Sequence, residues 1–207
     1  MSRLRYNRHH AIDTLKSNCP RMAELIREKG PFSLRVKRES DLFTSLASAI
    51  AYQQLSGKAA ATIYGRFESL FENNKPVAAA AVNLSIETLR SVGLSNNKAL
   101  AILDLAEHTC SGSLPDTRKM AALDDEAVIK SLCRVRGIGP WTVQMHLIFS
   151  LGRPDVMPAT DLGIQKGVQQ TYALPALPKP DEVLAVTRHL APYRSVASWY
   201  FWRCVDD

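Results

Sequence analysis

The 207-residue sequence has little cysteine, few aromatic residues and no long apolar run. Its four cysteines lie far apart, without the close spacing of a zinc finger or an iron–sulfur cluster, so we expect no metal bound by side chains and no other cofactor. No stretch is apolar enough to span a bilayer, and the N-terminal segment lacks the apolar core of a signal peptide. These absences predict a protein of the cytoplasm and nucleoid in a bacterium, or of the nucleus in a eukaryote, with no membrane partner and with cysteines as reduced packing residues.

The charge balance is basic, with 26 Lys and Arg against 20 Asp and Glu, a net charge of +6. That excess favours a polyanionic partner, although an ordinary basic protein would show it too. The hydrophobic fraction of 46% is typical of a globular chain, and the length suits one or two compact domains.

No segment alternates with the period of a strand, so the expected fold class is all-α. Ser56 and Ser95 are good N-caps, and Pro20 ends one helix where the next begins. We expect helices over residues 8–29, with a break at Pro20, then over 41–52 and 56–71, followed by a short alanine-rich helix that ends at residue 82. Further helices are expected over 85–91, 96–109, 124–132, 140–152, 161–168, 181–190 and 194–204.

The segment 132–146, LCRVRGIGPWTVQMH, is typical of a helix, a tight turn and a second helix. Gly137 and Gly139 would supply φ > 0 without a steric penalty, and Pro140 is pre-set for the first position of a helix. The N–H groups of such a turn, with the positive end of the helix dipole behind them, form a cradle for a phosphate. An ordinary helix–helix corner is the alternative, because Gly-x-Gly alone is weak evidence.

Four blocks in this order resemble the helix-hairpin-helix DNA glycosylases, in particular the AlkA-like alkylpurine branch with its compact yeast and bacterial 3-methyladenine enzymes. They are AIAYQQLSGKAAATI (49–63), LRSVGLSNNKA (89–99), the hairpin and its sequel (132–168) and PYRSVASWYFWR (192–203). The resemblance covers residues 42–203. It implies two helical lobes with the active-site cleft between them, one of residues 42–150 with the hairpin at 132–150, the other of residues 1–41 and 151–207.

In this family Asp161 would be the catalytic carboxylate. Cleavage of an N-glycosidic bond builds positive charge on the sugar, which a fixed carboxylate stabilises while it orients or deprotonates the attacking water. Removal of such a group typically costs roughly 3–4 kcal/mol of transition-state stabilisation. The alternative is that Asp161 merely caps the next helix, and both roles can coexist.

Trp141 stands where lyase-competent relatives carry an attacking lysine, so the resemblance implies a monofunctional enzyme that leaves an abasic site intact. Its indole would stack on a flipped base, more strongly on a cationic one, in a pocket shared with Tyr193 and Met145. The alternative is a tryptophan packed in the core. Bases such as 3-methyladenine and 7-methylguanine are already cationic leaving groups, so one carboxylate suffices; ethenoadenine and hypoxanthine are further candidates.

The block that contains Gln54 and Leu55 resembles the loop that enters the duplex when a nucleotide is flipped out. Leu55 would be the wedge and Gln54 would hold the gap, whereas a leucine in a polar loop is otherwise a core contact. His146 is expected to be packed or solvent-facing rather than catalytic. Phosphate contacts are expected from Gly137, Gly139 and Thr142, with Lys58, Lys98 and Lys166 as weaker candidates.

The sequence therefore predicts a monomeric DNA glycosylase that acts on double-stranded DNA containing alkylated bases. Two alternatives stay open. One is an abasic-site or lesion-binding protein with little catalysis, and the other is a helix-hairpin-helix module that only grips phosphates, with an affinity that falls steeply with salt.

Overall fold

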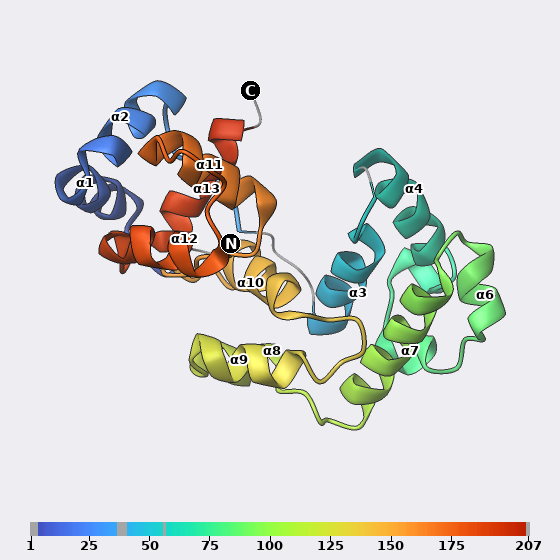
Figure 1. Cartoon of the computed structure of the whole chain (residues 1–207). Coiled ribbons are helices and arrows are strands. Elements are labelled where there is room, and N and C mark those ends of the chain that lie inside the picture. Colours follow the sequence, from blue (N-terminus) through green and yellow to red (C-terminus); the bar gives the residue numbers. More distant parts are fainter. Residues whose placement is uncertain (1–3, 37–40, 56, 206–207) are drawn as a thin grey trace. The chain divides into compact units, whose positions relative to one another are not determined.

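The computed structural model describes residues 4–36, 41–55 and 57–205, and within these ranges the regular elements are helices with no strand (Figure 1). The all-α prediction is therefore confirmed. No helix among these residues is long and apolar enough to cross a membrane.

The chain divides into two compact units, one of Met1–Arg38 and Leu147–Asp207 and the other of Glu39–His146. The second boundary lies inside helix α10 (Pro140–Phe149), four residues before the predicted one. Its last turn belongs to the first unit because Leu147 and Ile148 are buried and the ring of Phe149 stacks on Trp202. The cleft expected between the units stays a prediction.

The first unit combines the two ends of the chain. The C-terminal helix α13 packs against α1, α2 and α11, and Figure 1 shows the blue and red helices side by side. Its elements are α1 (Arg8–Asn18), α2 (Pro20–Lys29), α11 (Leu162–Tyr172), α12 (Pro180–Thr187), the 3₁₀ turn η2 (Arg188–Leu190) and α13 (Arg194–Val205).

The second unit is built around a long helix, α7 (Asn96–Cys110), which packs against α3, α5 and α6. Phe43, Leu46, Ile50, Leu89 and Ile102 are among its fully buried side chains, each of which stabilises the fold by about 1.5–3 kcal/mol. Its other elements are α3 (Leu42–Tyr52), α4 (Gly57–Glu68), η1 (Glu72–Asn74), α5 (Ala78–Ala81), α6 (Ile86–Ser91), α8 (Thr117–Ala122), α9 (Asp125–Leu132) and the first part of α10.

Local signals place most helix starts where the sequence predicts them. Ser95 accepts a hydrogen bond from the backbone of Lys98, Asp124 caps α9 in the same way, and Pro20 begins α2. The predicted cap at Ser56 lies outside the described residues. Helix α8, a six-residue helix with a buried Met120, was not predicted because so short a segment shows no helical period.

None of the four cysteines, all of which lie in the described part of the chain, forms a disulfide. Cys19 is buried, as expected of a packing residue, and burial raises the pKa of the half-buried Cys133 thiol. Cys110 is exposed, so the prediction that every cysteine packs in the interior is wrong for that residue.

Candidate functional site

The hairpin turn between α9 and α10 uses its two glycines differently. Gly137 has φ +74°, and a Cβ there would lie 3.2 Å from the Cβ of Ala101. Gly139 is outside the left-handed region, and a Cβ there would meet no heavy atom within 4 Å. The prediction that the turn needs φ > 0 at both glycines is therefore right for Gly137 and wrong for Gly139. Among the described residues, no atom occupies the space that a side chain at position 139 would enter.

Two buried side chains and one carboxylate hold the turn in place. Val135 and Ile138 are buried, and the backbone N–H of Arg136 donates to Asp104 Oδ2 at 2.7 Å. Pro140 then begins α10, as predicted. The first N–H groups of a helix have no intrahelical acceptor, so the start of α10 presents donors and a positive dipole end.

The predicted wedge loop follows α3 and is exposed at its tip. Gln54 adopts φ +55°, an unusual conformation for a residue other than glycine, and the Leu55 side chain is 40% exposed. The alternative that Leu55 is a core contact is therefore wrong.

A side chain that the sequence analysis did not single out ties this loop to the hairpin. Gln53 Nε2 donates to the Gly137 carbonyl oxygen at 3.0 Å and to Thr142 Oγ1 at 3.3 Å. Gln53 thus links the base of the wedge loop to both sides of the hairpin turn. Thr142 is only 5% exposed, and its hydroxyl oxygen already accepts the hydrogen bond from Gln53.

Lys98, a weaker candidate for a phosphate contact, also makes contacts inside the protein. Its Nζ donates to the carbonyl oxygens of Ala51 and Gln53, both at 2.8 Å, at the C-terminal end of α3. Partial burial lowers the pKa of this amine. Carbonyl groups at a helix end have no intrahelical donor, so Lys98 caps α3 and supports the wedge loop. The other predicted lysines, Lys58 and Lys166, are exposed.

The second unit also contains the predicted base-contacting residues of α10. The Trp141 side chain is 42% exposed, so the alternative of a tryptophan packed in the core is wrong. Met145, one turn further along, is half-buried. His146 is buried, and its Nδ1 shares a 2.9 Å hydrogen bond with Ser45 Oγ, which confirms the packed interpretation.

Asp161 belongs to the first unit and caps α11. Its Oδ1 accepts a hydrogen bond from the backbone N–H of Ile164 at 2.9 Å, so the capping interpretation is correct. The same oxygen accepts a second hydrogen bond, also 2.9 Å, from the indole Nε1 of Trp202 on α13. The carboxylate is half-buried and receives donors from two helices.

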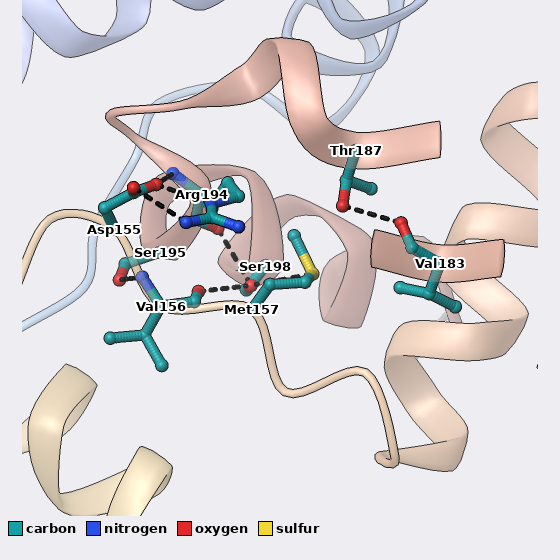
Figure 2. Close-up of polar contacts among 8 residues, drawn as sticks. All are labelled: Asp155, Val156, Met157, Val183, Thr187, Arg194, Ser195 and Ser198. Atoms are coloured by element: carbon teal, nitrogen blue, oxygen red, sulfur yellow. Dashed lines mark hydrogen bonds and ion pairs between the residues drawn. The ribbon is translucent and has the colours of Figure 1, made fainter. Parts of the chain in front are cut away.

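The loop that leads to Asp161 is fastened to the start of α13 (Figure 2). Arg194 donates from Nε and Nη2 to the two carboxylate oxygens of Asp155, at 2.7 and 2.9 Å. This contact raises the pKa of the guanidinium above its ordinary value. Ser195 Oγ accepts from the Val156 N–H at 2.9 Å, and Ser198 Oγ donates to the Val156 carbonyl at 3.2 Å. These bonds restrain the backbone shortly before the catalytic candidate.

Tyr193 lies in the same unit, in an aromatic group with the N-terminal segment. Its ring centroid is 6.0 Å from that of Tyr6 and 5.9 Å from the imidazole of His10, which meets it edge-on. Burial raises the pKa of Tyr6 to about 12. Tyr193 is half-buried.

The predicted residues therefore fall into two groups. The first unit holds a restrained carboxylate and one aromatic ring, and the second holds the predicted phosphate cradle, an exposed loop and an exposed indole. The chain offers a carboxylate able to stabilise positive charge, and no amine at the position of Trp141. Sequence reasoning missed Gln53 and Trp202, although both lie inside the blocks that carry the resemblance. Residues Asp161, Tyr193 and Lys166 belong to the first unit, and Gln54, Leu55, Lys58, Lys98, Gly137, Gly139, Trp141, Thr142 and Met145 to the second.

Comparison with known proteins gives a consistent result. Residues 47–192 match the model of the HhH-GPD superfamily of base excision DNA repair proteins. The chain is 37% identical over 193 residues to DNA-3-methyladenine glycosylase 1 of Schizosaccharomyces pombe. The aligned region covers 93% of this chain and 84% of that protein.

Two solved structures are similar over most of their length. One is the S. pombe 3-methyladenine DNA glycosylase Mag1 in complex with abasic DNA, with a TM-score of 0.85, 35% identity and coverage of 93% of this chain and 95% of that one. The other is a DNA-3-methyladenine glycosidase from Bacillus halodurans, with a TM-score of 0.83, 35% identity and coverage of 93% and 87%.

Proposed function

Because the chain belongs to the HhH-GPD superfamily of base excision DNA repair proteins, we propose that it is a monofunctional DNA glycosylase that excises alkylated purines from duplex DNA. The observation that carries the proposal is Asp161, a carboxylate anchored by two N–H donors at the start of a helix. The names of its relatives make 3-methyladenine the first substrate to test. We extend the proposal to 7-methylguanine and, as weaker candidates, to ethenoadenine and hypoxanthine.

The chemistry follows from the charge that develops during cleavage. An alkylated purine that carries a positive charge departs as a neutral base, so the protein need not protonate it. Positive charge then builds on the sugar, where the Asp161 carboxylate stabilises it and directs a water to the anomeric carbon. With an indole at position 141 instead of an amine, no Schiff base forms there and the strand stays uncut.

The remaining residues hold the DNA and the extruded base. The hairpin N–H groups at Gly137, Gly139 and Thr142 bind a backbone phosphate, with Lys58 and Lys166 as outer charges. Leu55 and Gln54 enter the stack where the nucleotide has left. Trp141, Tyr193 and Met145 contact the base by stacking and apolar packing. The protein acts as a monomer on chromosomal DNA, in a nucleoid or a nucleus.

The test is release of free base from methylated duplex DNA under single-turnover conditions, with products resolved by chromatography. Asp161→Asn keeps a cap of similar quality but removes the charge, so we expect the rate to fall about 10²- to 10³-fold. Asp124→Asn is the matched control, because Asp124 caps α9 by the same bond and has no proposed part in the reaction. It should release base at the wild-type rate.

Three results would contradict the proposal in different ways. Wild-type protein that binds abasic DNA tightly but releases no base would be a lesion-recognition protein. Affinity that ignores lesions and falls steeply with salt would indicate a phosphate-gripping module. Base release that survives in Asp161→Asn would mean that another group stabilises the sugar.

A further inference from the structure

We propose that Trp202 is a positioning residue for Asp161, and that its indole N–H holds the carboxylate in the orientation used for base release. This inference rests on the proposed function. It starts from the 2.9 Å contact of Trp202 Nε1 with Asp161 Oδ1. The helix cap alone, made to the Ile164 N–H, fixes the carboxylate from one side only. The indole adds a second donor from a different helix, on the same oxygen.

Trp202 is itself held in place by aromatic packing. The ring of Phe149, at the end of α10, stacks on the indole with a centroid distance of 5.6 Å and an interplanar angle of 29°. Both residues belong to the first unit, so the whole arrangement is internal to one compact body. A side chain restrained by packing delivers its N–H in a fixed direction, which is what preorganisation of a charged group requires.

Two glycines on α11 make the contact possible. A Cβ at Gly163 would lie 2.9 Å from Trp202 Cδ1 and 3.0 Å from Asp161 Oδ1, so any larger residue would enter the space that the pair occupies. A Cβ at Gly167 would lie 2.3 Å from the Phe201 carbonyl oxygen. Residues four apart share one face of a helix, so this face of α11 admits α13 closely enough for the indole to reach the carboxylate.

The test replaces the indole by a ring without the N–H. Trp202→Phe keeps an aromatic ring to stack on Phe149, and we expect single-turnover base release to fall about tenfold, the effect of losing part of a hydrogen bond to a charged group. Affinity for abasic-site DNA should change less than about twofold, because the indole acts on the reacting carboxylate and not on the DNA. Trp199→Phe is the matched control on the same helix, since Trp199 packs edge-on against Phe32. It should behave as wild type.

A double-mutant cycle separates positioning from packing. In an Asp161→Asn background the indole has no charged group to orient, so adding Trp202→Phe should cause no further loss of rate. A purely structural role would slow both backgrounds equally. The cycle overturns the inference if the losses multiply, and so does a Trp202→Phe rate equal to wild type.

An NMR measurement tests the bond without the risk that Trp202→Phe fails to fold. The indole N–H signal of Trp202 should move in Asp161→Asn, where a neutral acceptor replaces the carboxylate, while the signal of Trp199 stays. No movement would overturn the inference. If Asp161→Asn still releases base, the proposed role of Asp161 is wrong. If that variant is inactive but Trp202→Phe is fully active, only the positioning role is wrong.

Discussion

Glycine appears in both parts of the candidate site, but for opposite reasons. On α11, Gly163 and Gly167 are required by the protein itself, since Trp202 and the α13 backbone occupy the space of a Cβ. In the hairpin, Gly139 has an ordinary φ and open space around the missing Cβ. A glycine that has room for a side chain is explained if a ligand must approach its backbone closely. The α11 glycines are therefore explained by internal packing, and for Gly139 we propose the approach of a DNA phosphate.

The largest effect should come from Gly167→Ala. Its Cβ would fall 2.3 Å from a backbone oxygen, and a helix backbone cannot yield as a flexible side chain can. We expect the free energy of unfolding to fall by about 3 kcal/mol, at the upper end of typical overpacking. Thermal or denaturant unfolding followed by circular dichroism measures it. Gly65→Ala on α4, where a Cβ meets nothing within 4 Å, is the control and should be neutral or stabilising. Equal stability of the two variants would break the comparison.

Gly163→Ala should affect chemistry more than stability. The added methyl would press on both Trp202 Cδ1 and Asp161 Oδ1, and small displacements of a catalytic group are expensive in rate. We expect single-turnover base release to fall about tenfold, with affinity for abasic DNA within about twofold of wild type. An unchanged rate would show that the carboxylate tolerates displacement and would weaken the case for Trp202.

Gly139→Ala should leave the free protein intact and weaken DNA binding. Because the new methyl projects into open space, thermal stability should stay at the wild-type level. We expect affinity to fall about fivefold for damaged and undamaged duplexes alike, since phosphate contacts carry no sequence information. Fluorescence anisotropy with both duplexes checks this. Undiminished affinity would mean that the phosphate does not approach position 139.

The smallest effect concerns the two lysines near the wedge loop. Lys98→Met removes two bonds to carbonyls at the end of α3, and we expect a loss of about 0.5 to 1 kcal/mol in unfolding free energy with the salt dependence of DNA binding unchanged. Lys58→Met should instead leave the unfolding free energy unchanged and reduce the salt dependence of DNA binding, with the slope of the log binding constant against log salt smaller by about 1. A reduced slope for Lys98→Met would restore Lys98 as a phosphate contact.

Whether the sequence could predict an interaction depended on how far apart its two residues lie along the chain. The caps at Ser95 and Asp161 bind an N–H three residues away, so residue type and spacing were enough. The contacts of Gln53 with Gly137 and of Lys98 with Ala51 join residues 84 and 47 positions apart. The Trp202 indole meets Asp161 across 41 positions. The resemblance brought these blocks to attention, but only packing in three dimensions shows which polar atoms face one another.

The left-handed glutamine at the tip of the wedge loop has a thermodynamic consequence. A residue with a Cβ at φ near +55° is higher in free energy by about 1–2 kcal/mol than the same residue at negative φ. Gln53 and Lys98 hold the segment just before it, so the free protein retains this excess in the exposed turn itself. If Gln54 changes to negative φ during base flipping, this free energy is released, and it offsets part of the free-energy cost of unstacking the DNA.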